Sequence, residues 1–285
     1  MPPFTPALGP NRMFRRVFSR REVRRPSTDC QVAVSSTIEP VAEDPPAAGR
    51  RPVLRQQWAE LAYFHWVYEP EVVQRRLPAG LTVDTFDGSA WVGLIPFEMR
   101  DVQLGPTPPV PWLGTFIEIN VRTYVVDSLG RRAVWFFSLD VPRSMIVAVA
   151  RSVFALPYCW AQTSHVSDGA QHRYEMTRKW PRSPATSAEM SFSVGDVIAR
   201  GDVSDLDHFL TARWGLITQR RSRLLYGQVR HPRWPLCRVE GVQIDENVIA
   251  AAGLPSPVGL PRALYSPGVD VEVAWFQNVP GEEAQ

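Results

Sequence analysis

Proline and glycine divide this sequence into many short apolar runs, and that division constrains the fold more than any other feature. The 285 residues include 27 prolines and 18 glycines, and the runs between them suit short strands joined by turns better than long helices. Apolar residues form 45% of the chain, so it can bury a full core, and its length fits one large domain or two small ones. The sequence therefore predicts a β-rich protein.

The clearest predicted strand covers residues 115–126, where two kinds of side chain alternate. Its apolar face carries Ile117, Ile119, Val121, Thr123 and Val125, and its other face carries Phe116, Glu118, Asn120, Arg122 and Tyr124. The second face either points outward into solvent or lines a polar barrel interior. Because the apolar face must pack against another element, the pattern alone favours an outward polar face.

The remaining predicted elements are short strands interrupted by a few helices. Strands are predicted over 81–86, 90–99, 132–139, 159–166, 171–178, 188–194, 215–219, 222–230, 236–245 and 270–276, and helices over 70–77, 144–155, 204–213 and 246–252. The first two of these strands are expected to form a hairpin at Asp87-Gly88. In the second helix, Met145, Val149 and Val153 have the spacing of core-facing residues. Such a series predicts a closed or nearly closed barrel with helical insertions.

The N-terminal region differs in composition from the rest of the chain. Nine of the 31 basic and five of the 29 acidic residues lie in 1–51, which leaves 22 basic against 24 acidic residues beyond it. We expect 1–53 to be a disordered Arg/Pro-rich extension, 54–278 to be a single barrel domain and 279–285 to be a flexible tail. The Arg-rich segment 11–25 keeps a targeting presequence or a membrane-surface helix open as alternatives.

Composition and motifs argue against several classes of function. The nearly neutral body has no basic stripe for nucleic acid, and no apolar run approaches the roughly 20 residues of a membrane span. Cys30, Cys159 and Cys237 form no CxxC pair, which indicates a reducing compartment and predicts a cytoplasmic protein. The histidines show no HxH or HExxH spacing, and no nucleotide-binding glycine motif is present. Neither a metal nor another cofactor is predicted.

Several segments of the chain share their pattern with a known family. They are residues 58–66, Leu77-Pro78-Ala79-Gly80-Leu81, Phe86-Asp87-Gly88, Trp91-Val92-Gly93-Leu94, residues 118–125, Trp135-Phe136-Phe137-Ser138-Leu139 and Leu156-Pro157-Tyr158. Together they resemble the DUF2071 (YqjF-like) family of the acetoacetate decarboxylase-like superfamily, over about residues 54–278. The resemblance implies an α+β, mainly β fold, namely an acetoacetate decarboxylase-like β-barrel with a few helical insertions. The resemblance implies no particular activity, because the family has no settled one.

Residues 150–161 resemble the active-site segment of the acetoacetate decarboxylases, but without its lysines. In those enzymes two consecutive lysines follow a proline, and one of them forms a Schiff base with a β-keto acid. Tyr158 and Cys159 stand at these two positions, and a tyrosine cannot form an imine. The chain's one lysine, Lys179, lies outside the motif, and a solvated surface position is expected for it. Schiff-base chemistry is therefore not predicted.

The resemblance also implies site residues on the strand over 115–126. Glu118 matches a strand that bears a catalytic glutamate in the decarboxylases, with a similar spacing to Tyr158, and its counterpart points into the pocket. Glu118 would move a proton and Tyr158 would stabilise a developing oxyanion, although a tyrosine that only fills the barrel is an equal alternative. Arg122 or Arg151 would hold a substrate carboxylate, with a structural Glu118–Arg122 pair as the alternative.

Cys159 and His65 are the remaining candidates for substrate contact. A thiol is nucleophilic only when its pKa is lowered, and a histidine needs an ordered partner to act as a base. We favour a buried apolar role for Cys159 and a structural role for His65.

Two functions from different classes follow from these observations. The first is a protein whose barrel pocket binds a small organic acid, either as a lyase- or isomerase-type enzyme without imine chemistry or as a catalytically silent relative. The second is a non-catalytic ligand-binding or scaffold protein whose barrel is filled by side chains, for which ten tryptophans and thirteen phenylalanines suffice. Because decarboxylase relatives form oligomers, a homo-oligomer is left open. A cavity where Glu118 and Tyr158 converge would favour the first function.

Overall fold

The computed structural model describes residues 37–47, 51–108, 114–181 and 185–280, and within these ranges the chain is mainly β. The strands are β1 (Pro52–Tyr68), β2 (Leu81–Val83), β3 (Ala90–Leu104), β4 (Phe116–Asp127), β5 (Arg132–Val141), β6 (Tyr158–Asp168), β7 (Gln171–Trp180), β8 (Ser187–Val197), β9 (Gly215–Arg220), β10 (Arg223–Arg230), β11 (Cys237–Glu246), β12 (Arg262–Ala274) and β13 (Gln277–Asn278). The helices are α1 (Pro70–Gln74), α2 (Ser144–Val153), α3 (Asp205–Thr211) and α4 (Val248–Ala251), with a 3-10 turn at Arg200–Asp202. None of these helices has the length and apolar character of a membrane span.

The strands form one large sheet in which several strands, β5 and β12 among them, divide one edge between two partners. The order is β13-β10-β9-β5-β6-β7-β8-β11-β12-β1-β3-β4-β2, and β5 also pairs with β4 and β10 with β12. One edge of β5 follows β4, while its other edge pairs in parallel with β9 near Val134 and with β6 near Asp140. β12 likewise follows β1 and shares its other edge between β11 and β10. Following the pairings from strand to strand thus leads back to the starting strand, as expected for a barrel-like sheet.

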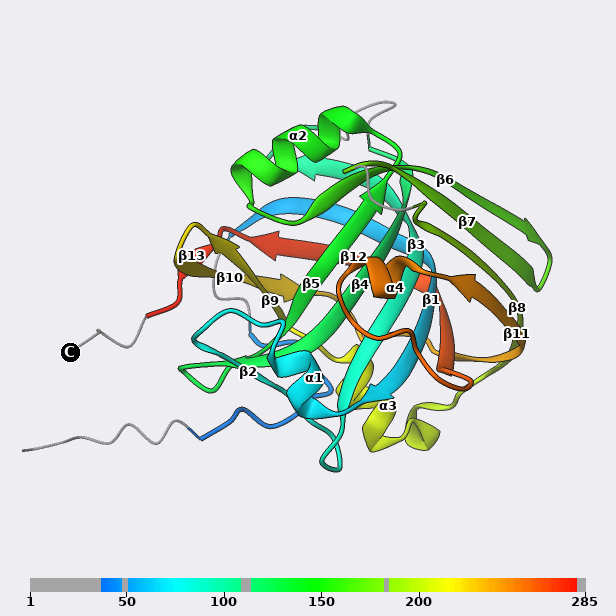
Figure 1. The fold of residues 1–285 in the computed structure, drawn as a ribbon, viewed down its shortest axis with the longest axis horizontal. Coiled ribbons are helices and arrows are strands. Elements are labelled where there is room, and N and C mark those ends of the chain that lie inside the picture. Colours follow the sequence, from blue (N-terminus) through cyan, green and yellow to red (C-terminus); the bar gives the residue numbers. More distant parts are fainter. Residues whose placement is uncertain (1–36, 48–50, 109–113, 182–184, 281–285) are drawn as a thin grey trace, which may run out of the picture. The chain divides into compact units, whose positions relative to one another are not determined.

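This division places two layers against one shared sheet, which consists of β12, β1, β3, β4 and β5 (Figure 1). The first layer is β6, β7, β8 and β11, and the second layer is β9, β10 and α2. Alternate residues of the shared sheet enter separate hydrophobic clusters: Phe64 and Val121 pack with first-layer residues, and Tyr63 and Phe97 pack with α2 residues. Each face of the shared sheet therefore has its own interior.

Several local predictions differ from the structure. β12 begins at Arg262, eight residues before its predicted start. The predicted hairpin at Asp87-Gly88 is wrong beyond its turn, because β2 pairs with β4 and only a single bridge joins Phe86 to Ser89. β3 also runs on to Leu104, five residues past its predicted end. In α2 the predicted face is wrong, since Met145 is 56% and Val153 43% exposed while Val147 and Ala150 are buried. The helix carries two apolar stripes, and spacing alone does not say which one meets the core.

Residues 37–47, within the segment expected to be an extension, contact turns and loops next to the strands. The Glu39 amide donates to the Gly130 carbonyl at 2.9 Å, and the Trp214 indole donates to the Ala42 carbonyl at 2.8 Å. Arg233 forms ion pairs of 2.6 Å with Glu43 and Asp44. At the end of the predicted extension, Pro52 and Val53 already belong to β1, and its residues 1–36 and 48–50, with Cys30, lie outside the described ranges. The proposed domain boundaries stay a prediction.

Candidate functional site

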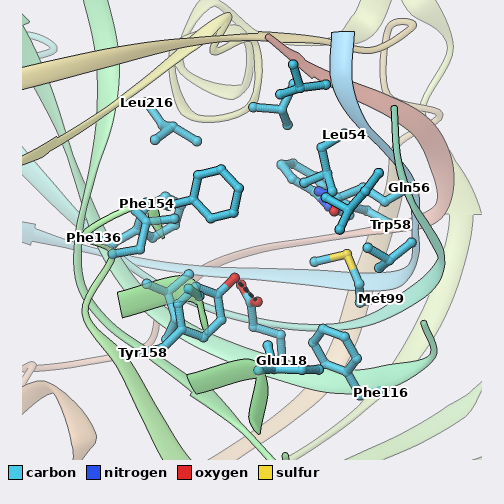
Figure 2. A pocket seen from close by; sticks show the side chains of 18 of the residues that line it. Leu54, Gln56, Trp58, Met99, Phe116, Glu118, Phe136, Phe154, Tyr158 and Leu216 are labelled. Carbon is cyan, nitrogen blue, oxygen red and sulfur yellow. Dashed lines mark hydrogen bonds between the residues drawn. The ribbon is translucent and has the colours of Figure 1, made fainter. Parts of the chain in front are cut away.

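A cavity of about 280 Å³ lies between the shared sheet and the second layer, beneath α2. Figure 2 shows the side chains that line it. Strand alternation supplies its walls: Leu54, Gln56 and Trp58 of β1 are two residues apart and all face it. The other lining residues are Val53, Met99, Val102, Leu104, Phe116, Glu118, Phe136, Leu139, Met145, Ile146, Ala150, Phe154, Leu156, Tyr158, Leu216, Val273 and Phe276. Almost all of these side chains are apolar.

Glu118 and Tyr158 meet at the wall of this cavity, as Figure 2 shows. The Tyr158 hydroxyl donates to Glu118 Oε2 at 3.1 Å, and the Asn120 amide donates to Glu118 Oε1 at 3.4 Å. Glu118 is only 2% exposed. The two residues predicted to be catalytic are thus in direct contact, although they stand 40 positions apart.

Burial sets the protonation of this pair. It raises the pKa of Glu118 to about 7, against the opposing effect of the hydrogen bonds from Tyr158 and Asn120. Burial and the neighbouring Glu118 carboxyl raise the pKa of Tyr158 well above its ordinary value. Near neutral pH, Glu118 therefore exchanges between acid and carboxylate while Tyr158 keeps its proton. Such a carboxyl is suited to general acid–base chemistry.

The chain after α2 positions Tyr158 through a sharp reversal. Ala155 has a left-handed backbone with φ of 55°, and Pro157 then prevents the helix from continuing. β6 starts at once, with Tyr158 opposite Leu139 of β5. Because successive strand residues face opposite ways, Tyr158 lines the cavity and Cys159 does not.

The polar face of β4 is buried, so the outward orientation favoured by the strand pattern alone is wrong. Glu118, Asn120, Arg122 and Tyr124 all point into the interior on the second-layer side, and each is less than 9% exposed. The apolar face meets the first layer through Val121 and its neighbours. Both faces of β4 are therefore covered, and one of the two interiors is polar.

Arg122 lies deeper than the cavity and does not line it. Its guanidinium donates to the Tyr124 hydroxyl and the Leu210 carbonyl, each at 3.4 Å, and lies 5.5 Å from the Tyr63 ring centre. Within the described ranges it makes no ion pair with Glu118, so the alternative Glu118–Arg122 pair is not formed. Its Nε is buried without a partner in the same ranges.

Arg151 also lies outside the cavity. Its Nη1 donates to the Tyr158 carbonyl at 2.7 Å, and its guanidinium lies 4.7 Å from the Trp180 ring centre. It borders a separate surface hollow with Trp160 and Trp180. Arg151 thus supports the backbone of Tyr158 from the opposite side.

His65 is fully buried behind the cavity, where its Nε2 lies 2.6 Å from the Tyr124 hydroxyl. Burial, assisted by the charges of Arg122 and Arg213, holds the pKa of His65 well below its ordinary value. A neutral, buried ring of this kind fits a structural role. The structure does not bring it to Glu118 or Tyr158.

Cys159 is expected to resist alkylation in the folded protein near pH 7.5. The side chain is buried, and burial raises the pKa of the thiol to about 11, so the reactive thiolate is scarce. Iodoacetamide treatment followed by peptide mass spectrometry, with and without urea, measures this. Equal labelling of Cys159 in folded and unfolded protein would contradict the buried placement.

Sequence reasoning missed most of the cavity wall. Trp58, Met99 and Phe136 were not predicted as site residues, because an apolar residue that lines a cavity has the same pattern as one in a packed core. The signal that was available is the alternation of Leu54, Gln56 and Trp58, in which one polar residue interrupts an apolar face. Lys179, the only lysine of the chain, is exposed on β7, away from the site.

Comparison with known proteins agrees with the expected family. Residues 55–270 match the model of the DUF2071 family, described as an uncharacterized conserved protein. The uncharacterized protein YqjF of Bacillus subtilis (strain 168) is 31% identical over 219 residues, which cover 77% of this chain and 89% of YqjF.

Solved structures with the same fold are acetoacetate decarboxylase-like proteins. The enduracididine biosynthesis enzyme MppR complexed with pyruvate matches with a TM-score of 0.56 and 12% identity, over 81% of this chain and 92% of MppR. Acetoacetate decarboxylase from Legionella pneumophila subsp. pneumophila str. Philadelphia 1 matches with a TM-score of 0.54 and 13% identity, over 84% of this chain and 94% of the enzyme. At such low identity these matches show the fold alone.

Proposed function

Since this chain belongs to the DUF2071 family and has an acetoacetate decarboxylase-like fold, we propose that it binds a small organic molecule in the cavity beneath α2 and acts on it by acid–base chemistry. One observation carries the proposal: the hydrogen bond between Tyr158 and Glu118 lies at the wall of an open, largely apolar cavity. MppR, which has the same fold, is known in complex with pyruvate, and this supports a small molecule as the ligand.

Each member of the pair has a distinct role in this chemistry. Glu118, with a pKa near 7, removes or returns a proton at carbon, and Tyr158 donates a hydrogen bond to the oxygen that gains negative charge. These steps are those of a lyase- or isomerase-type enzyme. Because no lysine lines the cavity, the reaction proceeds without an imine.

The alternative, a non-catalytic binding or scaffold protein, required a barrel filled by side chains. The interior on the first-layer side is packed in that way, with large residues such as Phe64, Tyr174 and Phe192 fully buried. The cavity on the second-layer side is open, which supports the small-molecule proposal. A cytoplasmic location and a homo-oligomer stay predictions.

Solvent exchange at carbon tests the proposed chemistry directly. In D2O, the wild-type protein is expected to speed loss of the α-proton signal of a bound carbonyl compound, followed by proton NMR. Glu118→Gln should slow the exchange by about 10²- to 10⁴-fold, the usual contribution of a general base. Tyr158→Phe should slow it through loss of the oxyanion contact.

Tyr63→Phe is the matched control for this experiment. It removes a buried tyrosine hydroxyl from the same side of the shared sheet, at a position that does not line the cavity. Its exchange rate should equal that of the wild type. The catalytic assignment would be wrong if Glu118→Gln and Tyr158→Phe retained the wild-type exchange rate.

A further inference from the structure

No positively charged side chain of the described residues lines the cavity. Within the described ranges, the polar side chains that line it are Gln56, Glu118, Tyr158 and the indole of Trp58, and no lysine, arginine or histidine is among them. A ligand would therefore be surrounded mainly by hydrocarbon, with hydrogen-bonding groups confined to a few positions. An ionic ligand gains little in such surroundings.

Three arginines near the site already bind groups outside the cavity. Arg122 contacts the Tyr124 hydroxyl and the Leu210 carbonyl, and Arg151 binds the Tyr158 carbonyl from outside. Arg178 forms two hydrogen bonds of 2.7 Å with Asp140. A carboxylate in the cavity would thus lie next to Glu118 without a counter-ion, and ionised Glu118 would repel it.

The pair of Glu118 and Tyr158 offers a different kind of contact. When Glu118 is protonated, the pair holds two hydroxyl hydrogens and only one of them is used within the pair, so one is free for a ligand oxygen. Below pH about 7 this is the main form, because burial raises the pKa of Glu118 to about 7. A carbonyl or ether oxygen accepts such a hydrogen bond without carrying charge.

The mouth of the cavity is apolar as well. Met145 of α2 and Leu104 of β3 both line it, and they are 56% and 50% exposed. Exposed apolar side chains at a cavity rim favour entry of an apolar molecule. The volume of about 280 Å³ is close to the lower end of the range for ligand pockets, about 300–1,000 Å³, so the ligand is a small molecule.

We propose that the ligand is an uncharged, largely apolar carbonyl compound of medium chain length, and not an organic acid. This rests on the proposed function, and it replaces the small organic acid expected from the sequence. The carbonyl oxygen lies against Glu118 and Tyr158, and the chain extends among Trp58, Met99 and Phe136.

Two probes with the same eight-carbon chain, 2-octanone and octanoate, test the proposal. Their dissociation constants are measured near pH 6 by calorimetry or by the fluorescence of Trp58 in the cavity wall. At this pH octanoate is an anion while Glu118 is mainly neutral. We expect 2-octanone to bind at least about 100-fold more tightly, because the anion loses its hydration without gaining a counter-ion.

The pH dependence of ketone binding provides a second readout. The ketone binds the protonated pair most tightly and the ionised pair, in which Tyr158 alone donates and Glu118 acts as the base, more weakly. Its affinity for the wild type should therefore fall by about tenfold or more between pH 6 and pH 8.5. Glu118→Gln keeps a hydrogen-bond donor at every pH, and its affinity for 2-octanone should stay constant over the same range. A wild-type affinity that does not change with pH would overturn the proposed contact.

The outcomes separate this inference from the proposed function. If octanoate binds as tightly as 2-octanone and Glu118→Gln alters its binding, the uncharged-ligand inference is overturned and the proposed site stands. If neither probe binds, or if binding survives both Ala150→Phe and Leu216→Phe, which fill the cavity from two different elements, both are overturned. Two filling variants are used so that a folding defect in one does not decide the result.

Discussion

Glu118→Gln is expected to raise the free energy of unfolding by about 3 kcal/mol at pH 8. Burial raises the pKa of Glu118 from 4.5 to about 7, so folding of the ionised form is penalised by this amount. The stability that the protonated carboxyl contributes is fully present below pH 4.5 and is lost as the pH rises to about 7. Glutamine stays neutral throughout, and its amide oxygen still accepts the Tyr158 hydroxyl.

Urea unfolding of the wild type and the variant at several pH values between 4.5 and 8 measures this difference. The two stabilities should nearly coincide at the acid end and separate as the pH rises. Glu240→Gln, which changes an exposed carboxyl, is the control and should shift stability by less than about 0.5 kcal/mol at any pH. Parallel pH profiles for the wild type and Glu118→Gln would show that Glu118 does not titrate near neutrality.

A second large effect is expected at the ion pair of Asp140 and Arg178, which lies beside the Tyr158 strand. Asp140 is fully buried and pairs with Cys159 in the β5–β6 register, and both of its oxygens accept from Arg178 of β7 at 2.7 Å. Arg178→Met leaves this carboxylate buried without a counter-ion. The expected loss is about 3–5 kcal/mol of unfolding free energy.

The same strand provides the control for that substitution. Arg173 of β7 pairs with Glu175 at 2.7 Å and Glu189 at 2.9 Å, but all three side chains are about half exposed. Arg173→Met should therefore cost less than about 1 kcal/mol in the same urea titration. Equal losses in the two variants would mean that burial of the Asp140 pair contributes nothing to its strength.

The strands were more predictable than the direction in which their side chains point. Alternation and turn residues identify β4 and β5, since both signals are local. Whether Glu118 and Arg122 face solvent or an interior depends on segments outside β4: Tyr158 of β6 contacts Glu118, and Leu210 of α3 contacts Arg122. A strand with a solvent-facing polar side and a strand with a buried polar side have the same alternating pattern, so the pattern could not predict which of the two β4 is.

The candidate site was predicted in part, and the family resemblance was its source. Nothing local joins Glu118 to Tyr158, yet the resemblance placed both at one site and they are hydrogen-bonded. It did not place Arg122 and Arg151, whose contacts depend on Leu210 and Trp180 from remote segments. The apolar walls could not be predicted, because burial in a core and exposure to a cavity select the same residue types.

The opposite orientations of Tyr158 and Cys159 have an evolutionary consequence. Tyr158 and Cys159 are the first two residues of β6. Tyr158 lines the cavity, and Cys159 packs outside it beside Asp140. Substitutions at 158 therefore change the lining of the cavity, and those at 159 change the packing beside Asp140. Two consecutive positions of one strand are therefore under different constraints, one from the cavity and one from the packing of the sheet.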